Sequence, residues 1–426
     1  MRGCVALIVA LDTKGEDGAF VRSRLEAGGF TVTLIDVGVQ GTPTIPSDIS
    51  RAEVARAAGE DVLDIAARGD RGKAVNVMAQ GAAQVLSALA QEGRADAVMA
   101  MGGSAGTTIG TTAMRRLPFG IPKLMVSTVA SGDTRPYVGH ADIVMVPSVA
   151  DVAGLNRISR VVYAHAVDAL SGMLAGKASD QSLPTKTSKP VVGATMFGVT
   201  TACVSRAQVG LQESGCEVVA FHATGVGGNA MEQLIQDGLI DAALDLTTTE
   251  WADELVGGIL SAGPHRLEAA GRVGLPQVVS VGALDMVNLG PISEIPVEFR
   301  ERNLHVHNAH NTLMRTTAEE SRELGRIIAT KLNQASGPAA LVLPLRGISA
   351  LDHPGQPFYD NEAREALFAA LRATLDTEKV HLRELDLHIN DAEFADSCVA
   401  MLLSMLEGAK FDCPGKPSHL PTLKEI

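Results

Sequence analysis

The sequence predicts an α/β protein with two Rossmann-like domains, each a doubly wound parallel sheet, related by internal duplication. Apolar residues make up 46% of the 426 residues but aromatic residues only 3%. Such a core of Ala, Val, Leu and Ile is typical of sheets covered by helices on both faces. Strand-like apolar runs alternate with helix-like segments, and the second half of the chain repeats the order of the first.

The duplication rests on four pairs of segments that occur in the same order in both halves. Residues 5–38 align with 191–224, 92–104 with 237–249, 120–131 with 274–285, and Leu155 and Arg157 with Leu313 and Arg315. Each copy therefore reads as β-α-β-α-β-α-β. The aligned strand ends pair Asp36 with His222, Ala105 with Glu250, Ser131 with Asp285, and Val149 with His307.

The remaining elements follow in chain order from local signals. After its second strand the first copy carries an insertion, with helices predicted over 51–68 and 73–91. The polar stretch 176–190 contains two prolines and no periodicity, which indicates a linker. We therefore predict domains over 1–176 and 190–426, with a linker over 177–189. An extension follows the second copy: strand 339–345, loop 346–359, helix 360–375, strand 379–387 and helix 391–407.

Charge and cysteine usage exclude several classes of protein. A net charge of −13 argues against nucleic-acid binding and against binding to acidic membrane surfaces, which both need a basic face. The five cysteines show no C-x-x-C pair, which indicates a reduced, cytoplasmic protein. No apolar run approaches the roughly 20 residues of a membrane span.

A nucleotide site is predicted at the strand ends of the first domain. Glycines and hydroxyls in a loop that opens a helix can bind an anion through backbone N–H groups, a lysine adds charge, and an acid after the second strand can bind a ribose. Glycines that serve only tight turns are the simpler alternative. The predicted nucleotide-binding residues are Asp12, Thr13, Lys14, Gly15, Asp36, Gly102, Gly103, Ser104, Gly106 and Thr107.

Titratable groups gather at the equivalent strand ends of the second domain. Acids and imidazoles suit proton transfer, and an arginine can bind a carboxylate or phosphate. The predicted catalytic residues are His222, Glu250, Asp285, His307 and Arg315. The predicted substrate-binding residues are Thr200, Thr201, Thr224, Gly225, Gly227, Gly228, Asn308, Arg346 and Ser349. Capping or surface roles explain the histidines at 305, 307 and 310 more simply than metal ligation, so no metal site is predicted.

Several of these motifs resemble one known family. "LDTKGE", "MGGSAGT", "MFGVTT", "FHATGVGGNAME", "LDLTTTE", "GALDMVNLGP" and "TLMRTT" are similar to those of the Tm-one-like ATP-binding domain family, named from a tomato mosaic virus resistance protein. The resemblance runs from about residue 5 to 407. It departs from the pattern at Ala105, where a glycine is expected, and at Ala309 and His310. It implies two Rossmann-like domains, ATP bound by the first, alone or with Mg²⁺, and a homodimer.

The sequence thus predicts an ATP-binding protein that acts as an enzyme on a small carboxylate or carbonyl metabolite. ATP-dependent ligation or phosphoryl transfer, and hydrolysis or carbon–carbon cleavage without ATP chemistry, both stay open. The alternative is a non-catalytic dimer, stabilised by ATP, that docks on a protein partner. The missing G-x-G-x-x-G fingerprint disfavours a dehydrogenase.

Overall fold

The computed structural model describes residues 3–152, 154–179 and 189–408. The chain divides into two compact units, Met1–Pro184 and Thr185–Ile426, each described here by itself. Most of the predicted linker 177–189 lies outside the described residues, while residues 177–179 belong to the last helix of the first unit rather than to a linker.

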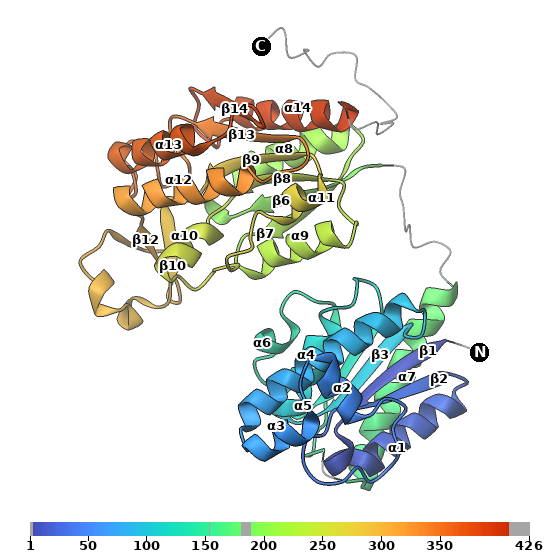
Figure 1. Cartoon of the computed structure of the whole chain (residues 1–426). Coiled ribbons are helices and arrows are strands. Elements are labelled where there is room, and N and C mark those ends of the chain that lie inside the picture. Colours follow the sequence, from blue (N-terminus) through green and yellow to red (C-terminus); the bar gives the residue numbers. More distant parts are fainter. Residues whose placement is uncertain (1–2, 153, 180–188, 409–426) are drawn as a thin grey trace. The chain divides into compact units, whose positions relative to one another are not determined.

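The first unit contains a five-stranded parallel sheet with the order β2-β1-β3-β4-β5 (Figure 1). The strand order reverses between β1 and β3, so that successive crossovers cover opposite faces. The strands are β1 (Cys4–Val9), β2 (Thr31–Asp36), β3 (Ala97–Gly102), β4 (Lys123–Ser127) and β5 (Ile143–Pro147).

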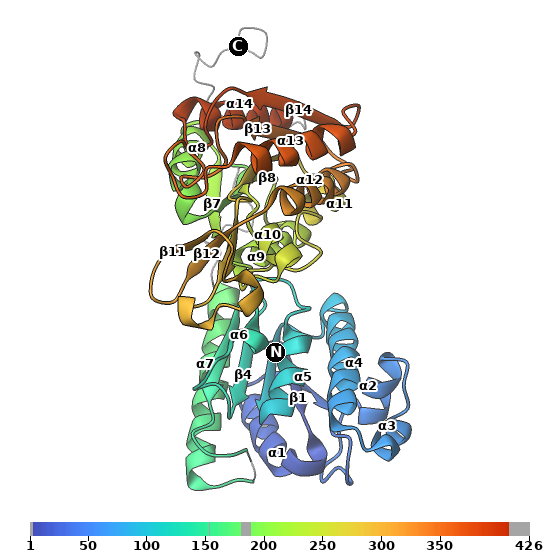
Figure 2. The same cartoon turned by 90° about the vertical axis from the view of Figure 1, so that its left-hand side faces the viewer.

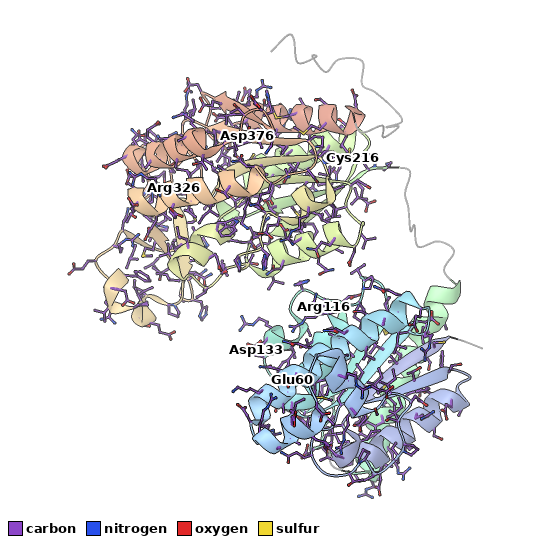
Figure 3. The ribbon with its side chains drawn as sticks, in the orientation of Figure 1. Glu60, Arg116, Asp133, Cys216, Arg326 and Asp376 are labelled. Atoms are coloured by element: carbon purple, nitrogen blue, oxygen red, sulfur yellow. The ribbon has the colours of Figure 1, made fainter. Side chains whose placement is uncertain are left out.

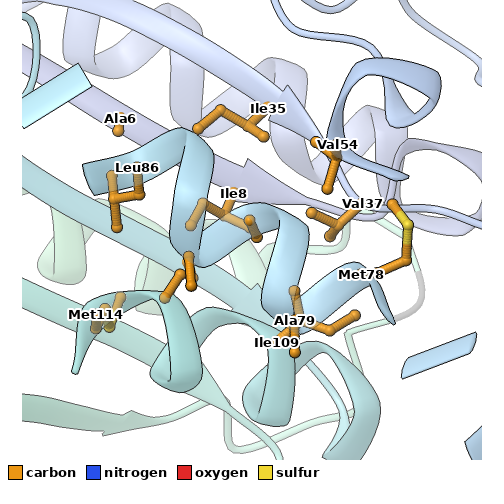
Figure 4. Packing of buried hydrophobic residues seen from close by; sticks show 14 of the residues in the cluster. Ala6, Ile8, Ile35, Val37, Val54, Met78, Ala79, Leu86, Ile109 and Met114 are labelled. Carbon is orange, nitrogen blue, oxygen red and sulfur yellow. The ribbon is translucent and has the colours of Figure 1, made fainter. Parts of the chain in front are cut away.

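In the part of the first unit that the structure describes, helices cover both faces of this sheet. Alternate side chains of β1 point to opposite faces of the sheet. Ala6 and Ile8 pack with α2, α4 and α5 (Figure 4), whereas Leu7 packs with α1 and α7. The near-continuous apolar strands are those expected of a parallel sheet buried on both faces. The helices are α1 (Leu11–Ala27), α2 (Arg51–Ala57), α3 (Val62–Arg68), α4 (Arg71–Gln91), α5 (Ser104–Met114), α6 (Arg135–Val138) and α7 (Arg157–Ser179).

Two local predictions for the first unit are wrong. The helix predicted over 51–68 is two helices, because Gly59 adopts φ +79° and Asp61 caps a new helix by accepting a hydrogen bond from Leu63 N at 2.8 Å. Asp12 to Gly15, expected in a loop before a helix, are already helical, since α1 begins directly after β1, with one break in helical geometry at Lys14.

The second unit contains a six-stranded parallel sheet with the order β14-β13-β9-β8-β6-β7. Cores lie on both of its faces, one built with α12 and α13, the other with α8 and α14 (Figures 1 and 2). Its strands are β6 (Val191–Met196), β7 (Glu217–His222), β8 (Ala242–Thr247), β9 (Gln277–Gly282), β13 (Ala339–Pro344) and β14 (Val380–Leu385).

The helices of the second unit present charged side chains to solvent, such as that of Arg326 on α12 (Figure 3). They are α8 (Thr201–Glu213), α9 (Val226–Gln236), α10 (Glu250–Val256), α11 (Ala269–Val273), α12 (Ala318–Leu332), α13 (Asn361–Thr374) and α14 (Ala392–Gly408). Short 3₁₀ turns, η1 to η3, cover Gly198–Thr200, Ile292–Glu294 and Val297–Phe299.

A separate antiparallel sheet interrupts the second unit between β9 and α12. It has the order β10-β12-β11 and consists of β10 (Met286–Leu289), β11 (Leu304–Val306) and β12 (Thr312–Arg315). In both views β12 lies apart from the strands of the parallel sheet (Figures 1 and 2).

The predicted fold class is confirmed: two α/β units, each with a parallel sheet. The order β2-β1-β3-β4 of the first unit matches β7-β6-β8-β9 of the second, as duplication requires. The fourth alignment is wrong, because Leu313 and Arg315 lie in β12 of the small antiparallel sheet, whereas Arg157 begins helix α7. The position that β5 occupies beside β4 belongs to β13 beside β9, so Val149 and His307 are not equivalent strand ends.

Candidate functional site

A cavity of about 420 Å³ lies at the carboxyl edge of the first sheet. Residues that follow β1, β2 and β3 form it together with the start of α4. Open α/β sheets bind ligands where the strand order reverses, which here lies between β1 and β3. The lining residues are Ala10, Asp12, Thr13, Val37, Gly38, Val39, Gln40, Arg71, Ala74, Val75, Ala105, Gly106 and Ile109.

The lining of this cavity is largely apolar but includes one exposed cation, Arg71. Of the predicted nucleotide-binding residues, Asp12, Thr13 and Gly106 line it. The sequence analysis missed Arg71 because the predicted helix begins at residue 73. The signal that could have found it is Asp70, the N-cap of α4, which accepts a hydrogen bond from Lys73 N at 3.0 Å.

The start of α5 borders the cavity and has no side-chain cap. Its N-cap residue, Gly103, has φ −79°, and a Cβ there would meet no heavy atom closer than Thr128 Oγ1 at 3.7 Å. Neither backbone strain nor packing therefore requires glycine at 103. At Gly102, by contrast, a Cβ would lie 2.9 Å from the Cα of Gly106, so close strand–helix packing explains that glycine. A glycine without a packing role, at an open helix start, is typical of a place where a ligand approaches the backbone.

Asp12 and Asp36 fix the loop after β2. Asp12 accepts hydrogen bonds from Val39 N at 3.1 Å and Gln40 N at 2.9 Å, while Asp36 accepts from Leu11 N and Gly38 N. Asp36 is buried, which raises the pKa of its carboxyl group despite these two hydrogen bonds. The ribose-binding role predicted for Asp36 is therefore replaced by a structural one.

Lys14 and Gly15 also have structural roles in place of the predicted phosphate contact. The Lys14 ammonium donates a hydrogen bond to the carbonyl oxygen of Val152, in the loop after β5. A Cβ on Gly15 would overlap the hydroxyl of Thr44. Thr107 is buried, where its hydroxyl shares a 2.6 Å hydrogen bond with Ser127. Ser104 is the exposed first residue of α5.

A second cavity, of about 620 Å³, lies at the ends of β4 and β5 in the same unit. Ser127, Thr128, Ser131 and Ser148 contribute hydroxyls to it, and Asp151 contributes a carboxylate. Val149, another lining residue, has φ +64°, an unusual conformation for a β-branched residue. Thr128 N donates to the carbonyl of Gly102, so this cavity continues the edge where α5 begins.

In the second unit, a side chain of the protein occupies the glycine loop that was predicted to bind an anion. Glu250 is buried, and its carboxylate accepts hydrogen bonds from Gly225 N at 2.7 Å and Gly228 N at 3.1 Å, at the start of α9. Arg266 Nε lies 2.7 Å from the same carboxylate. A Cβ on Gly227 would overlap the carbonyl of His222. Thr224 belongs to the same turn, where its hydroxyl donates to His222 O.

Arg266, also in this unit, was not among the predicted residues. It is 1% exposed and lies 2.5 Å from Asp245 and 3.2 Å from Glu232, besides its contact with Glu250. The three carboxylates raise the pKa of its guanidinium group, against the opposing effect of burial. Glu250 is therefore part of a buried ionic cluster, and its catalytic role stays a prediction.

Arg315 is buried and holds the 346–360 loop rather than a substrate. Its Nε donates to Phe358 O at 2.8 Å, and a terminal nitrogen donates to Thr316 Oγ1 at 2.7 Å. Asn308 shapes the turn between β11 and β12, where its side-chain oxygen accepts from Asn311 N at 3.0 Å. His307 is exposed in that turn, away from the parallel sheet on which its catalytic role was predicted.

Asp285 retains a feature typical of functional carboxyls. Ser349, predicted to bind substrate, donates to its Oδ2 at 2.6 Å, whereas its buried Oδ1 has no partner among the described residues. Burial raises the Asp285 pKa to about 6, against the lowering effect of Arg315. Nearby Ala283 has φ +57°, a strained conformation for a residue with a side chain.

His222 lies at the end of β7, and Thr200 and Thr201 follow β6. His222 is exposed and stacks on Phe197 with ring centroids 5.4 Å apart. Thr200 is buried and shares a 2.8 Å hydrogen bond with Thr247, while Thr201 is exposed and donates to Phe197 O at 3.1 Å. Over the part of the chain that the structure describes, no three His, Cys, Asp or Glu side chains are placed to bind a metal ion. Within the same residues, no helix combines the length and apolar character of a membrane span.

Comparison with known proteins places the whole chain in one family. Residues 3–179 match the model of the N-terminal domain, and residues 189–406 that of the C-terminal domain, of an uncharacterised protein family, UPF0261. A UPF0261 protein of Clostridium tetani is 49% identical over 403 residues, covering 95% of this chain and 99% of the relative. One of Rhizobium meliloti is 45% identical, covering 93% and 97%.

A plant relative contains the same region within a longer protein. The ToMV resistance protein Tm-1(GCR237) of Solanum lycopersicum is 43% identical over 359 residues, which cover 84% of this chain and 47% of the tomato protein. The chain therefore spans about half the length of that relative. With both domain models matched in order, the chain belongs to the UPF0261 family, and it is also similar to a Tm-1 protein, as its motifs predicted.

Proposed function

We propose that the protein binds ATP in the cavity between β1 and β3 of the first unit. The observation that carries this proposal is Gly103, a glycine that neither strain nor packing requires, at the uncapped start of α5. The cavity beside it has a volume within the usual range for small-molecule sites. An uncapped helix start offers free N–H groups and partial positive charge to a phosphate.

The residues present fit the parts of a nucleotide. The first N–H groups of α5, from Ser104 to Gly106, suit phosphate oxygens, and Arg71 supplies the cation that Lys14 was expected to provide. Val37, Val75 and Ile109 offer apolar surface to a base. When bound, ATP would supply a transferable phosphoryl or nucleotidyl group.

The second part of the proposal is an enzyme whose other ligand, a small carboxylate or carbonyl metabolite, binds the second unit. Asp285 supports this part, because a buried carboxyl with a raised pKa can retain or give up a proton near neutral pH. We also propose a homodimer, which light scattering of the purified protein would test. The alternative, a purely protein-binding role, predicts that substitutions at Asp285 leave partner binding unchanged.

Calorimetric titration with ATP, with and without Mg²⁺, tests the nucleotide site. Arg71→Ala should weaken binding by about tenfold or more, because one charge-assisted contact is lost. Gly103→Ala should also weaken it, because the added methyl group has room in the fold but stands where the phosphate would approach.

Matched controls are available in the same unit. Lys73→Ala removes a neighbouring exposed cation of α4 that does not line the cavity, and Gly172→Ala adds a methyl group to α7 where no atom lies within 4 Å. Both controls should bind ATP like the wild type. If the wild type does not bind ATP, or if Arg71→Ala and Gly103→Ala both bind it unchanged, the proposal is refuted.

A further inference from the structure

A cavity of about 370 Å³ lies at the carboxyl ends of β13 and β14 in the second unit. Leu345 follows β13 directly, and His388 follows β14, which is the adjacent parallel strand. The 346–360 loop and the start of α13 complete the walls. Two arginines and one aspartate, Arg346, Arg364 and Asp391, are the formally charged residues in the lining. Each arginine also pairs with an aspartate outside the lining, Arg346 with Asp386 and Arg364 with Asp352.

Arg364 is a fixed, buried cation in this cavity. It is 7% exposed, and one terminal nitrogen lies 2.7 Å from Oδ1 of the fully buried Asp352. Its guanidinium carbon lies 5.5 Å from the centre of the Tyr359 ring, which also lines the cavity. A guanidinium group held by a carboxylate and an aromatic ring keeps a constant orientation, as recognition of a planar oxyanion requires.

Arg346 is a second cation, and it is free to change partner. Its guanidinium group forms a bidentate pair with Asp386, at 2.9 Å and 2.7 Å. Both side chains are more than half exposed, so the pair contributes little to stability. A ligand in the cavity can therefore bind Arg346 in place of Asp386 with little loss of free energy.

The buried histidine of the cavity is neutral and structural. His388 Nε2 lies 2.9 Å from the carbonyl of Ser349, which can only accept, and its Nδ1 accepts from Asn390 N at 3.1 Å. Burial lowers the His388 pKa, consistent with a neutral ring. Asp391 in turn accepts from His388 N at 2.7 Å. These groups fix the loop, while the two arginines provide the charge that a ligand would meet.

We propose that this cavity binds a small organic or inorganic oxyanion, through a carboxylate or phosphate group contacted by Arg346 and Arg364. Ser349 links the cavity to the candidate proton-transfer group, because its hydroxyl donates to Asp285 while its carbonyl accepts from His388. The choice of a small metabolite anion rests on the proposed function. The site itself lies on different residues from the ATP cavity.

Titration calorimetry of the full chain, in a buffer free of carboxylates and phosphate, tests this inference. Succinate and inorganic phosphate serve as separate probes of the two oxyanion types, and succinamide is the uncharged analogue of succinate. We expect saturable binding of at least one anion and binding of succinamide that is weaker by about tenfold or more. Arg346→Ala should weaken anion binding by about tenfold or more, and Arg346→Lys by less, since it retains the charge without the planar fork.

Arg372→Ala is the matched control. Arg372 lies on α13 like Arg364 and pairs with Glu384 and Glu365, but it does not line the cavity. It should bind the anions like the wild type, and Arg346→Ala should retain ATP binding. Failure of the wild type to bind either anion, or equal anion binding by wild type and Arg346→Ala, would overturn the inference. Absence of ATP binding with normal anion binding would refute the proposed nucleotide site alone.

Discussion

Removal of Arg266 should destabilise the second unit more than any surface substitution. Arg266→Met keeps much of the side-chain volume but leaves Asp245, Glu250 and Glu232 without their shared cation. Asp245 and Glu250 are 2% and 1% exposed, so neither carboxylate regains full hydration. Removing one partner of a buried ion pair lowers the free energy of unfolding by about 3–5 kcal/mol. Domains are stable by only about 5–15 kcal/mol, so the loss is a large fraction of the total.

Urea unfolding of the full chain, monitored through the single tryptophan, provides the assay. Trp251 lies on α10 directly after Glu250, so its fluorescence reports on the affected unit. Arg272→Met is the control, because Arg272 is 60% exposed on the side chain and pairs with Glu268 at the surface. The control substitution should lower the free energy of unfolding by less than about 1 kcal/mol. If Arg266→Met lowers the free energy of unfolding no more than the control does, a structural role for the cluster is refuted.

The remaining predictions concern Asp285 and Gly228. Burial raises the pKa of Asp285 from 3.8 to about 6, so protonation of its carboxyl group stabilises the folded state. This stabilisation is fully present below the pKa of the unfolded chain and is lost as the pH rises through about 6. This pKa shift contributes at most about 3 kcal/mol to the free energy of unfolding. In Asp285→Asn the free energy of unfolding should therefore fall less between about pH 4 and pH 7 than in the wild type, and parallel pH profiles would contradict this. Gly228→Ala should lower the thermal midpoint, because the new Cβ would overlap the Glu250 carboxylate, whereas Gly238→Ala, at an exposed turn with φ +70°, tests the cost of a positive φ alone. Equal midpoints for the two variants would show that the Glu250 contact is unimportant.

The sequence was sufficient for the fold because apolar runs and their alternation with helices are local properties. It misplaced β11 because a short apolar segment looks the same in a hairpin as in a parallel strand, and only its partner, β12, shows the difference. It predicted catalytic roles for Glu250 and Arg315 because their residue types suit chemistry. Their actual partners are backbone groups of distant loops, which no local pattern reveals.

The site residues that the sequence analysis missed share a physical reason. No sequence motif marks them, and only their tertiary neighbours show the roles of Arg71, Arg266 and Arg364. Gly103 was among the predicted nucleotide-binding residues, but the sequence could not separate it from Gly102. That distinction depends on which atoms a Cβ would meet.

The Glu250 carboxylate at the start of α9 has a consequence for how the two repeats can respond to the cell. A helix start that already contains an anion from its own chain does not compete for free phosphate, so changes in phosphate or nucleotide concentration leave it unaffected. The start of α5 in the first unit, which follows β3 and is therefore not the counterpart of α9, has no side-chain cap. If the start of α5 binds ATP as proposed, the first unit would respond to nucleotide concentration, whereas the start of α9, bound to Glu250, would not.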